Sequence, residues 1–255
     1  METPFETTRS TEQIDHHARL AELIDSIELE EYLRPAAFAA IDWYTDDLPY
    51  HNIEHMFEVT ENVLALCKEH GIVGNERQIV FMAALWHDAA YPLPLEEYET
   101  SKEHRSALLA YEAIMAQVDP TDTELYAQTQ IFADGVASII ISSQHGRIPE
   151  GILEYILNTA DIKNLSGSVV EMLKKSLAFY LEGKQMAGEQ FIGSVEQYLS
   201  DHIEDFTGWC ETTQGILEGL VSNKLGASTI LETVRDNVKK ITPANIFELF
   251  RNSED

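Results

Sequence analysis

Histidines and aspartates of the kinds that bind metal ions occur in three separate motifs of the chain. His51 and His55 stand four residues apart in YHNIEH, His87 and Asp88 are adjacent in LWHDAAYP, and Asp161 lies in NTADIKNL. Four residues make about one turn of an α-helix, so the first two imidazoles could share a face, or His51 could precede the helix. Neutral imidazoles and carboxylates are ligands of divalent iron, manganese, zinc and nickel. The three motifs together therefore indicate a metal centre.

The surroundings of two of these motifs strengthen that interpretation. His87 and Asp88 close the segment ERQIVFMAALWHDAA, which is apolar nearly all round and is typical of a buried central helix. Asp161 continues an inward-facing stripe at helical spacing: Leu153, Ile156, Leu157 and Ala160. Burying a carboxylate without a partner costs on the order of several kcal/mol, so each should be paired or metal-bound. For Asp161 alone, a bond to a backbone amide or a helix cap is an equally good explanation.

Two more histidines lie between the second and third motifs. They are His104 in SKEHRSA and His145 in SSQHGR. Side chains on facing helices of a bundle can converge on a core metal site, and five or six such ligands would suit two ions rather than one. The remaining histidines have no comparable setting and are expected in solvent or in packing: His16, His17, His70 and His202.

Helical spacing dominates the segments that must position these residues, and alternating strand-like runs are scarce. One stripe runs from Ile53 to Cys67 and should stop near Gly71. SKEHRSALLAYEAIMAQV opens with a serine cap and is predicted to turn five side chains inward: Ala107, Leu108, Tyr111, Ile114 and Met115. ADGVASIIISSQH could be a strand or a helix, and its neighbours favour a helix. Pro149 is expected in the first turn of the next helix.

Further helices are expected beyond Leu165, over residues 169–181, 189–206 and 228–240. A last short helix is expected behind a Thr242 cap with Pro243 in its first turn. The sequence thus predicts one all-α domain over residues 1–255. Its motif core spans about residues 48–165, and a helical C-terminal extension spans about residues 166–255.

The composition limits the partners of this domain. The chain has 255 residues, 44% of them hydrophobic, which is enough for a substantial core. Its net charge of −27 argues against nucleic acid or an anionic membrane as a general partner. Two cysteines, no secretory signal and no apolar run of ~18 residues predict a reduced, soluble, cytoplasmic protein. The sequence leaves a homo-oligomer open.

The motifs, in their order and spacing, resemble those of the HD superfamily of metal-dependent phosphohydrolases. The matching segments are YHNIEHMFEV, ALWHDAAYP, SKEHRSALLA, SSQH and TADIKNL. The likeness is greatest to a bacterial branch with a Tyr-His-Asn-x-x-His motif, and a similar Tyr-His-Asn motif occurs in cyclic nucleotide phosphodiesterases. The resemblance covers roughly residues 48–165 and implies an HD-domain helical bundle.

The resemblance also implies roles for individual residues. His55, His87, Asp88 and Asp161 match the metal ligands of the superfamily, and Asp88 would be the residue able to bridge two ions. His51 matches the histidine that protonates the leaving oxygen in the phosphodiesterases. His104 stands where relatives often have glutamate, so either His104 or Glu103 could be a further ligand, with His145.

The implied activity is hydrolysis of a phosphate ester, of a nucleotide or a related small molecule, by metal-activated water. The resemblance implies one or two divalent ions and does not distinguish Mn, Fe, Mg, Ni or Zn. Four basic residues beside the motifs could bind the phosphate, although each could instead form a surface ion pair: Lys102, Arg105, Arg147 and Lys163.

Two other functions remain open at this stage. His55, His87, Asp88, His104, His145 and Asp161 also reproduce the ligand order of the superfamily's di-iron oxygenases, which resemble myo-inositol oxygenase and act on polyols or phosphonates. A hydrolase should accept a redox-inert divalent metal, whereas an oxygenase should require iron and oxygen. The second alternative is a non-catalytic module that keeps the site for sensing nucleotides.

Overall fold

The computed structural model describes residues 11–45, 47–91, 93, 101–144, 147–187, 202, 205–206, 208, 229–240 and 246. These residues form nine α-helices and no β-strand, which confirms the predicted all-α class. His145, most of the expected helix over residues 189–206, and the Thr242 and Pro243 cap lie outside the described residues.

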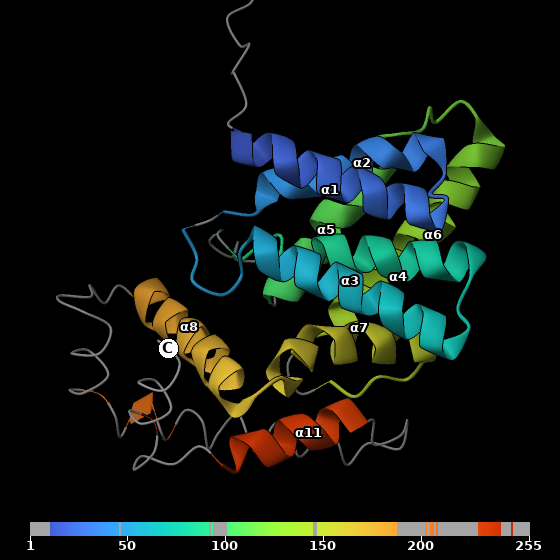
Figure 1. Cartoon of the computed structure of the whole chain (residues 1–255). Helices are drawn as coiled ribbons and strands as arrows, with labels where there is room; N and C mark the ends of the chain where they lie inside the picture. The colour runs from blue at the N-terminus through green and yellow to red at the C-terminus, as the bar shows by residue number, and fades with distance from the viewer. Residues whose placement is uncertain are drawn as a thin grey trace, which may run out of the picture.

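The helices follow one another along the chain as in Figure 1. Short 3-10 helices span Glu31–Leu33, Ala40–Trp43 and Asn164–Ser166. The α-helices are α1 (Thr11–Ile27), α2 (Arg34–Ala39), α3 (Ile53–His70), α4 (Gly74–Trp86), α5 (Lys102–Met115), α6 (Thr123–Ser142), α7 (Ile152–Lys163), α8 (Val169–Met186) and α11 (Thr229–Val238). None of these described helices is long and apolar enough to cross a lipid bilayer.

Helix α4 is the central element of the described bundle. It contacts α3, α5, α6 and α7, and every residue from Val80 to Trp86 is buried. This confirms the expectation from its apolar sequence, because a helix surrounded by other helices has no face left for polar residues. The helix ends at Trp86, so His87 and Asp88 begin the turn that follows it.

Helix α3 begins and ends as its sequence predicts. The Asn52 side chain accepts a hydrogen bond from the His55 backbone N–H at 3.1 Å, which caps the first turn. Gly71 ends the helix in the left-handed conformation, with φ of 69°, which glycine adopts without steric cost. These two caps fix where His55 lies on the helix.

Two predictions for α5 and α7 are wrong in detail. Leu108 is 36% exposed, while Leu109 is buried, so the inward face of α5 is rotated by about one residue from the predicted stripe. The small residues of that face, Ala107 and Ala110, let α5 pack closely on α6. Pro149 precedes α7 by three residues instead of standing in its first turn. The segment ADGVASIIISSQH contributes to α6, which confirms the preference for a helix over a strand.

The C-terminal extension contributes two described helices, α8 and α11. Helix α11 contacts α7 and α8, and Val234 packs with Met172 of α8 in a small hydrophobic cluster. In Figure 1, α8 and α11 lie on the opposite side of the bundle from α1 and α2. Helix α8 opens with a capping box between Ser168 and Glu171 and continues to Met186, five residues beyond its predicted end.

Candidate metal centre

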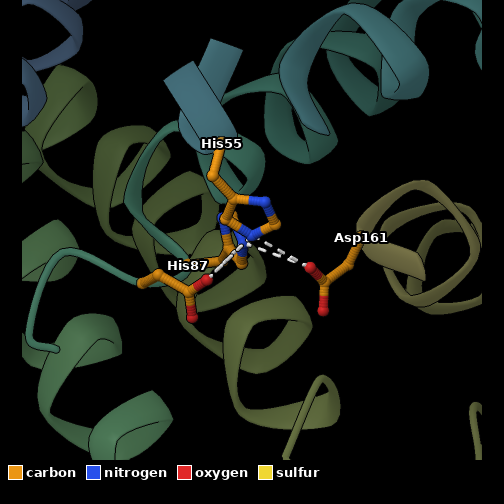
Figure 2. Close-up of side chains that lie close together, drawn as sticks. His55, His87 and Asp161 are labelled. Atoms are coloured by element: carbon orange, nitrogen blue, oxygen red, sulfur yellow. Dashed lines mark ion pairs between the residues drawn. The ribbon is translucent and has the colours of Figure 1, made fainter. Parts of the chain in front are cut away.

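Four side chains from three parts of the bundle form a compact, largely buried group. His55 comes from the first turn of α3, His87 and Asp88 from the turn after α4, and Asp161 from α7. One ligand atom from each lies within 4.8 Å of all the others. Figure 2 shows the labelled His55, His87 and Asp161 pointing toward one another. The group, called here the four-ligand group, could hold a metal ion.

The distances inside the four-ligand group match those between ligands of one ion. His55 Nε2 lies 3.2 Å from both Asp88 Oδ2 and Asp161 Oδ1. His87 Nε2 lies 2.8 Å from Asp88 Oδ2 and 3.8 Å from Asp161 Oδ1. Bonds of about 2.1 Å place neighbouring ligand atoms about 3.0 Å apart in octahedral and about 3.4 Å apart in tetrahedral geometry. The four atoms therefore surround a space of the right size.

The Nε2 atoms of the two histidines in this group lack hydrogen bonds within the described part of the chain. Nε2 of His55 and Nε2 of His87 are buried, and neither has a partner of hydrogen-bond geometry among the described residues. Leaving such a nitrogen unsatisfied costs about 1–3 kcal/mol. A divalent cation would satisfy both nitrogens and both carboxylates at once, so the residues fit a metal ion in their chemistry as well as in their spacing.

A second layer of contacts holds the ligands in place. His87 Nδ1 lies 2.8 Å from the Ala84 carbonyl oxygen, which accepts a hydrogen bond from an Nδ1–H and so directs the Nε2 lone pair toward the group. The buried Tyr44 hydroxyl donates to the Leu85 carbonyl at 3.0 Å and accepts from the Asp88 backbone N–H at 3.3 Å. These bonds fix the turn that carries both ligands.

The electrostatics of the group are those of strongly coupled charges. Burial alone would raise the pKa of Asp88, but the neighbouring histidines outweigh burial and hold that pKa well below its usual range. The pKa of Asp161 is lowered in the same way by His55 and His87. Burial works against the charge of both histidines, yet the two carboxylates raise their pKa values. Both aspartates are thus kept ionised, as metal ligands must be.

His51 lies beside the four-ligand group and is held from the far side by a glutamate. Its Nε2 is 3.7 Å from Asp88 Oδ2, while its Nδ1 bonds to a carboxylate oxygen of Glu182 on α8. The other oxygen of Glu182 accepts the backbone N–H bonds of Tyr50 at 2.9 Å and His51 at 2.8 Å. Glu182 is only 1% exposed. Burial opposes its charge, but the bonds from His51 and Tyr50 lower the pKa of Glu182.

Aromatic rings enclose the His51 imidazole. Tyr91 stacks on it with the ring centroids 3.5 Å apart and the planes 19° apart. Phe179 of α8 meets it edge-on with centroids 5.3 Å apart, and Tyr50 lies against both Phe179 and His55. Burial and the negative charge of Asp88 raise the pKa of Tyr91, so its hydroxyl stays protonated. The imidazole is therefore fixed in one plane by the stack and in one direction by Glu182.

Sequence reasoning missed the contribution of α8. Lys175, Phe179 and Glu182 recur at i, i+4 and i+7, so they share a face of α8 that turns toward α3 and the loop before it. Lys175 bonds both oxygens of Glu58 of α3 at 2.8 and 2.7 Å. The expected end of α8 at residue 181 excluded Glu182 by one position. The sequence did contain a signal for this contribution. Lys175, Phe179 and Glu182 form a polar and aromatic face of α8 in addition to its apolar face.

His104, His145 and Glu103 are the remaining predicted ligands. His104 lies in the first turn of α5 with its Nδ1 buried, and it is not part of the four-ligand group. His145 lies outside the described residues. Glu103 precedes His104 in the same turn. A second ion held by these residues stays a prediction.

The predicted phosphate-binding residues have varied surroundings. The Lys102 ammonium donates to the carbonyls of Ala90 at 3.4 Å, Tyr91 at 3.1 Å, and Leu93, so it braces the turn that carries His87 and Asp88. Arg105 is half-buried on α5, and Arg147 is exposed before α7. Lys163 is half-buried in the last turn of α7, two residues beyond Asp161.

The assignment of a function rests on the geometry of the site. No protein-family model matches the chain, and no curated protein matches it either. The all-helical fold and the buried histidine and aspartate cluster are compatible with an HD-type domain.

Proposed function

We propose that the protein is a metal-dependent phosphohydrolase of the HD superfamily, which cleaves a phosphate ester of a nucleotide or a related small molecule. One observation carries the proposal: an imidazole that is not a ligand is aimed at the four-ligand group. His51 Nε2 lies 3.7 Å from Asp88 Oδ2, and Glu182 holds the opposite ring nitrogen. A site that only stored a metal would not need a positioned acid beside it.

The four-ligand group supplies the place for the ion. His55, His87, Asp88 and Asp161 would hold a divalent metal, which supplies a Lewis acid that lowers the pKa of bound water and stabilises charge on phosphoryl oxygens. Asp161 is the most accessible of the four, with 30% of its side chain exposed, whereas the others are below 10%. Substrate would therefore approach from the side of α7.

His51 would act as the general acid. Nδ1–H donates to Glu182, which orients the ring so that Nε2 is directed toward the metal ligands. As water adds to phosphorus and the ester P–O bond breaks, the leaving oxygen takes the Nε2 proton. The neutral imidazole keeps its Nδ1–H bond to Glu182. Tyr91, stacked on the ring, prevents it from rotating away from the leaving group.

Product mass spectrometry in ¹⁸O-labelled water tests this proposal. The full chain would be incubated aerobically with Mn²⁺ or Fe²⁺ and a panel of nucleotides and small phosphate esters, beside an Asp88→Ala control. Label on the phosphate product of the wild type alone supports hydrolysis at phosphorus and identifies the ester class. Oxygen consumption with iron and a phosphonate or polyol, without ester cleavage, would refute it in favour of an oxygenase. Metal binding with no turnover in either assay would favour a sensor.

A further inference from the structure

A cavity lies near the C-terminal end of α3 and the N-terminal end of α4, away from the four-ligand group. It has a volume of about 330 Å³ and is formed where α1 and α3 end and α4 begins. Ser26, Lys68 and Val73 at its edge are exposed, so it opens to solvent, while Ile27 and Cys67 at its floor are buried. Volumes near 300 Å³ and above are those of pockets for small molecules.

The walls of this cavity combine an apolar body with two cations. Ile27, Leu64, Ile72 and Val73 supply the apolar surface, and Lys68 and Arg77 supply the charge. None of the described residues that line it is acidic. The chain has 44 acidic and 17 basic residues. A cavity lined by two basic residues and no described acidic residue therefore differs in charge from the chain as a whole.

Among the described residues, the two cations lack the carboxylate partners that several other basic residues of the bundle have. Arg19, Arg34 and Lys175 form ion pairs with carboxylates, whereas no carboxylate pairs with Lys68 or Arg77 within the described part of the chain. Arg77 is anchored through Nη2, which donates to the Ile27 carbonyl at 3.2 Å. Its Nε is buried and has no described hydrogen-bond partner. An anion in the cavity would offset the charge of the Arg77 guanidinium.

The backbone next to Arg77 adds to the positive potential. Val73 precedes α4 and offers no side-chain hydrogen bond to the first-turn N–H groups of that helix. The N-terminal end of a helix carries partial positive charge, so it favours an anion in the same place as the two side chains.

We propose that this cavity binds a small organic anion with an apolar body, of which a short-chain carboxylate is the simplest example. The carboxylate pairs with the Arg77 guanidinium and the Lys68 ammonium, while the hydrocarbon lies against Leu64 and Ile72. This inference does not depend on the proposed hydrolase activity. From Cys67 back to His55 is 12 residues of α3, and from Arg77 to His87 is 10 residues, or roughly 15–18 Å of helix rise. The ligand therefore does not compete with a metal at the four-ligand group.

Titration of the full chain with sodium hexanoate, followed by ligand-observed NMR, tests the inference. Hexanoate is expected to bind saturably, and 1-hexanol, inorganic phosphate and hexylammonium at least about tenfold more weakly, because each lacks the apolar body or the negative charge. Arg77→Gln should weaken hexanoate about tenfold or more. Lys174→Gln, which removes the same charge from an exposed position on α8, is the matched control and should leave the affinity unchanged.

Two further variants separate the alternatives. Ser26→Trp keeps the charge and fills the opening of the cavity, so it should abolish binding even if Arg77→Gln were to misfold. Asp88→Asn alters the four-ligand group and should leave hexanoate binding intact. Absence of saturable binding, equal binding of 1-hexanol, an equal loss in Lys174→Gln, or loss in Asp88→Asn would each overturn the proposal. The last result would place the probe at the metal centre instead.

Discussion

The substitution Glu182→Gln isolates the contact between α8 and His51. Glutamine has the size of glutamate but offers one acceptor oxygen in place of two. The backbone N–H groups of Tyr50 and His51 both donate to the same oxygen of Glu182, at 2.9 and 2.8 Å, so the glutamine oxygen can keep both bonds. The amide nitrogen then faces His51 Nδ1–H, and no hydrogen bond forms because both groups are donors. One charge-assisted hydrogen bond is lost while the rest of the loop is retained.

The expected effect follows from that single bond. A hydrogen bond to a charged group contributes about 1.5–3 kcal/mol, and a loss of about 2 kcal/mol from the transition state corresponds to roughly a thirtyfold fall in kcat. If His51 is the general acid proposed above, the fall should depend on the leaving group, because a general acid matters only where the departing oxygen needs a proton. Alkyl or nucleoside phosphate esters should show the full effect, and 4-nitrophenyl esters, whose leaving group is stable as an anion, should show little.

The assay compares kcat for the two ester classes and measures bound metal by mass spectrometry. Glu171→Gln is the matched control, since Glu171 is an exposed glutamate of the same helix that bonds only within the α8 capping box. It should lower stability slightly and leave the ratio of the two kcat values unchanged. An equal loss for both ester classes in Glu182→Gln, or a loss of bound metal, would refute the role assigned to Glu182.

Four other outcomes are expected. Chelation should lower the melting temperature and added Mn²⁺ should restore it, because the four ligand atoms then lack the cation that offsets their burial; calorimetry with and without chelator measures this. Tyr44→Phe removes the hydroxyl that accepts from the Asp88 backbone N–H and should weaken metal affinity about tenfold by isothermal titration. Lys102→Met should destabilise the protein by about 2 kcal/mol, or roughly 4–8 °C in melting temperature, through three released carbonyls, whereas Lys174→Met should change little. Burial raises the pKa of Cys67 to about 11, against a lowering by nearby positive charge, so folding favours the thiol. Its stabilisation is present below the unfolded pKa of about 9 and lost as pH rises toward 11, and peptide mapping at pH 8 should show iodoacetamide labelling of Cys67 only on unfolding.

The sequence was sufficient to predict the helical class and the four-ligand group because both depend on strong local signals. The apolar run of α4 forces a central position, and a buried His87 and Asp88 then require partners. The caps at Asn52 and Gly71 were equally readable, since each side chain or backbone conformation suits one place in a helix. The rotation of α5 was not readable, because leucines stand at both 108 and 109 and only packing on α6 selects between them.

The part of the site that escaped prediction depends on long-range contacts. Glu182 bonds His51 across 131 residues, and an acidic residue near a helix end is usually solvated. Tyr91 stacks on His51, a contact that no local sequence pattern predicts. Phosphate binding by Lys102 stays a prediction, and the contacts of its ammonium with backbone carbonyls of the turn were not foreseen. Residue spacing predicts which side chains share a helix face, but it does not predict which side chains the neighbouring element places against that face.

The separation of Glu182 from the metal ligands has a consequence during protein synthesis. Asp161, the last of the four ligands, leaves the ribosome 21 residues before Glu182, which at about 5–20 residues per second is an interval of roughly 1–4 seconds. A nascent chain can therefore bring its four-ligand group together before Glu182 has left the ribosome. Formation of the four-ligand group and bonding of His51 to Glu182 are then separate events in time, and docking of α8 is the later one.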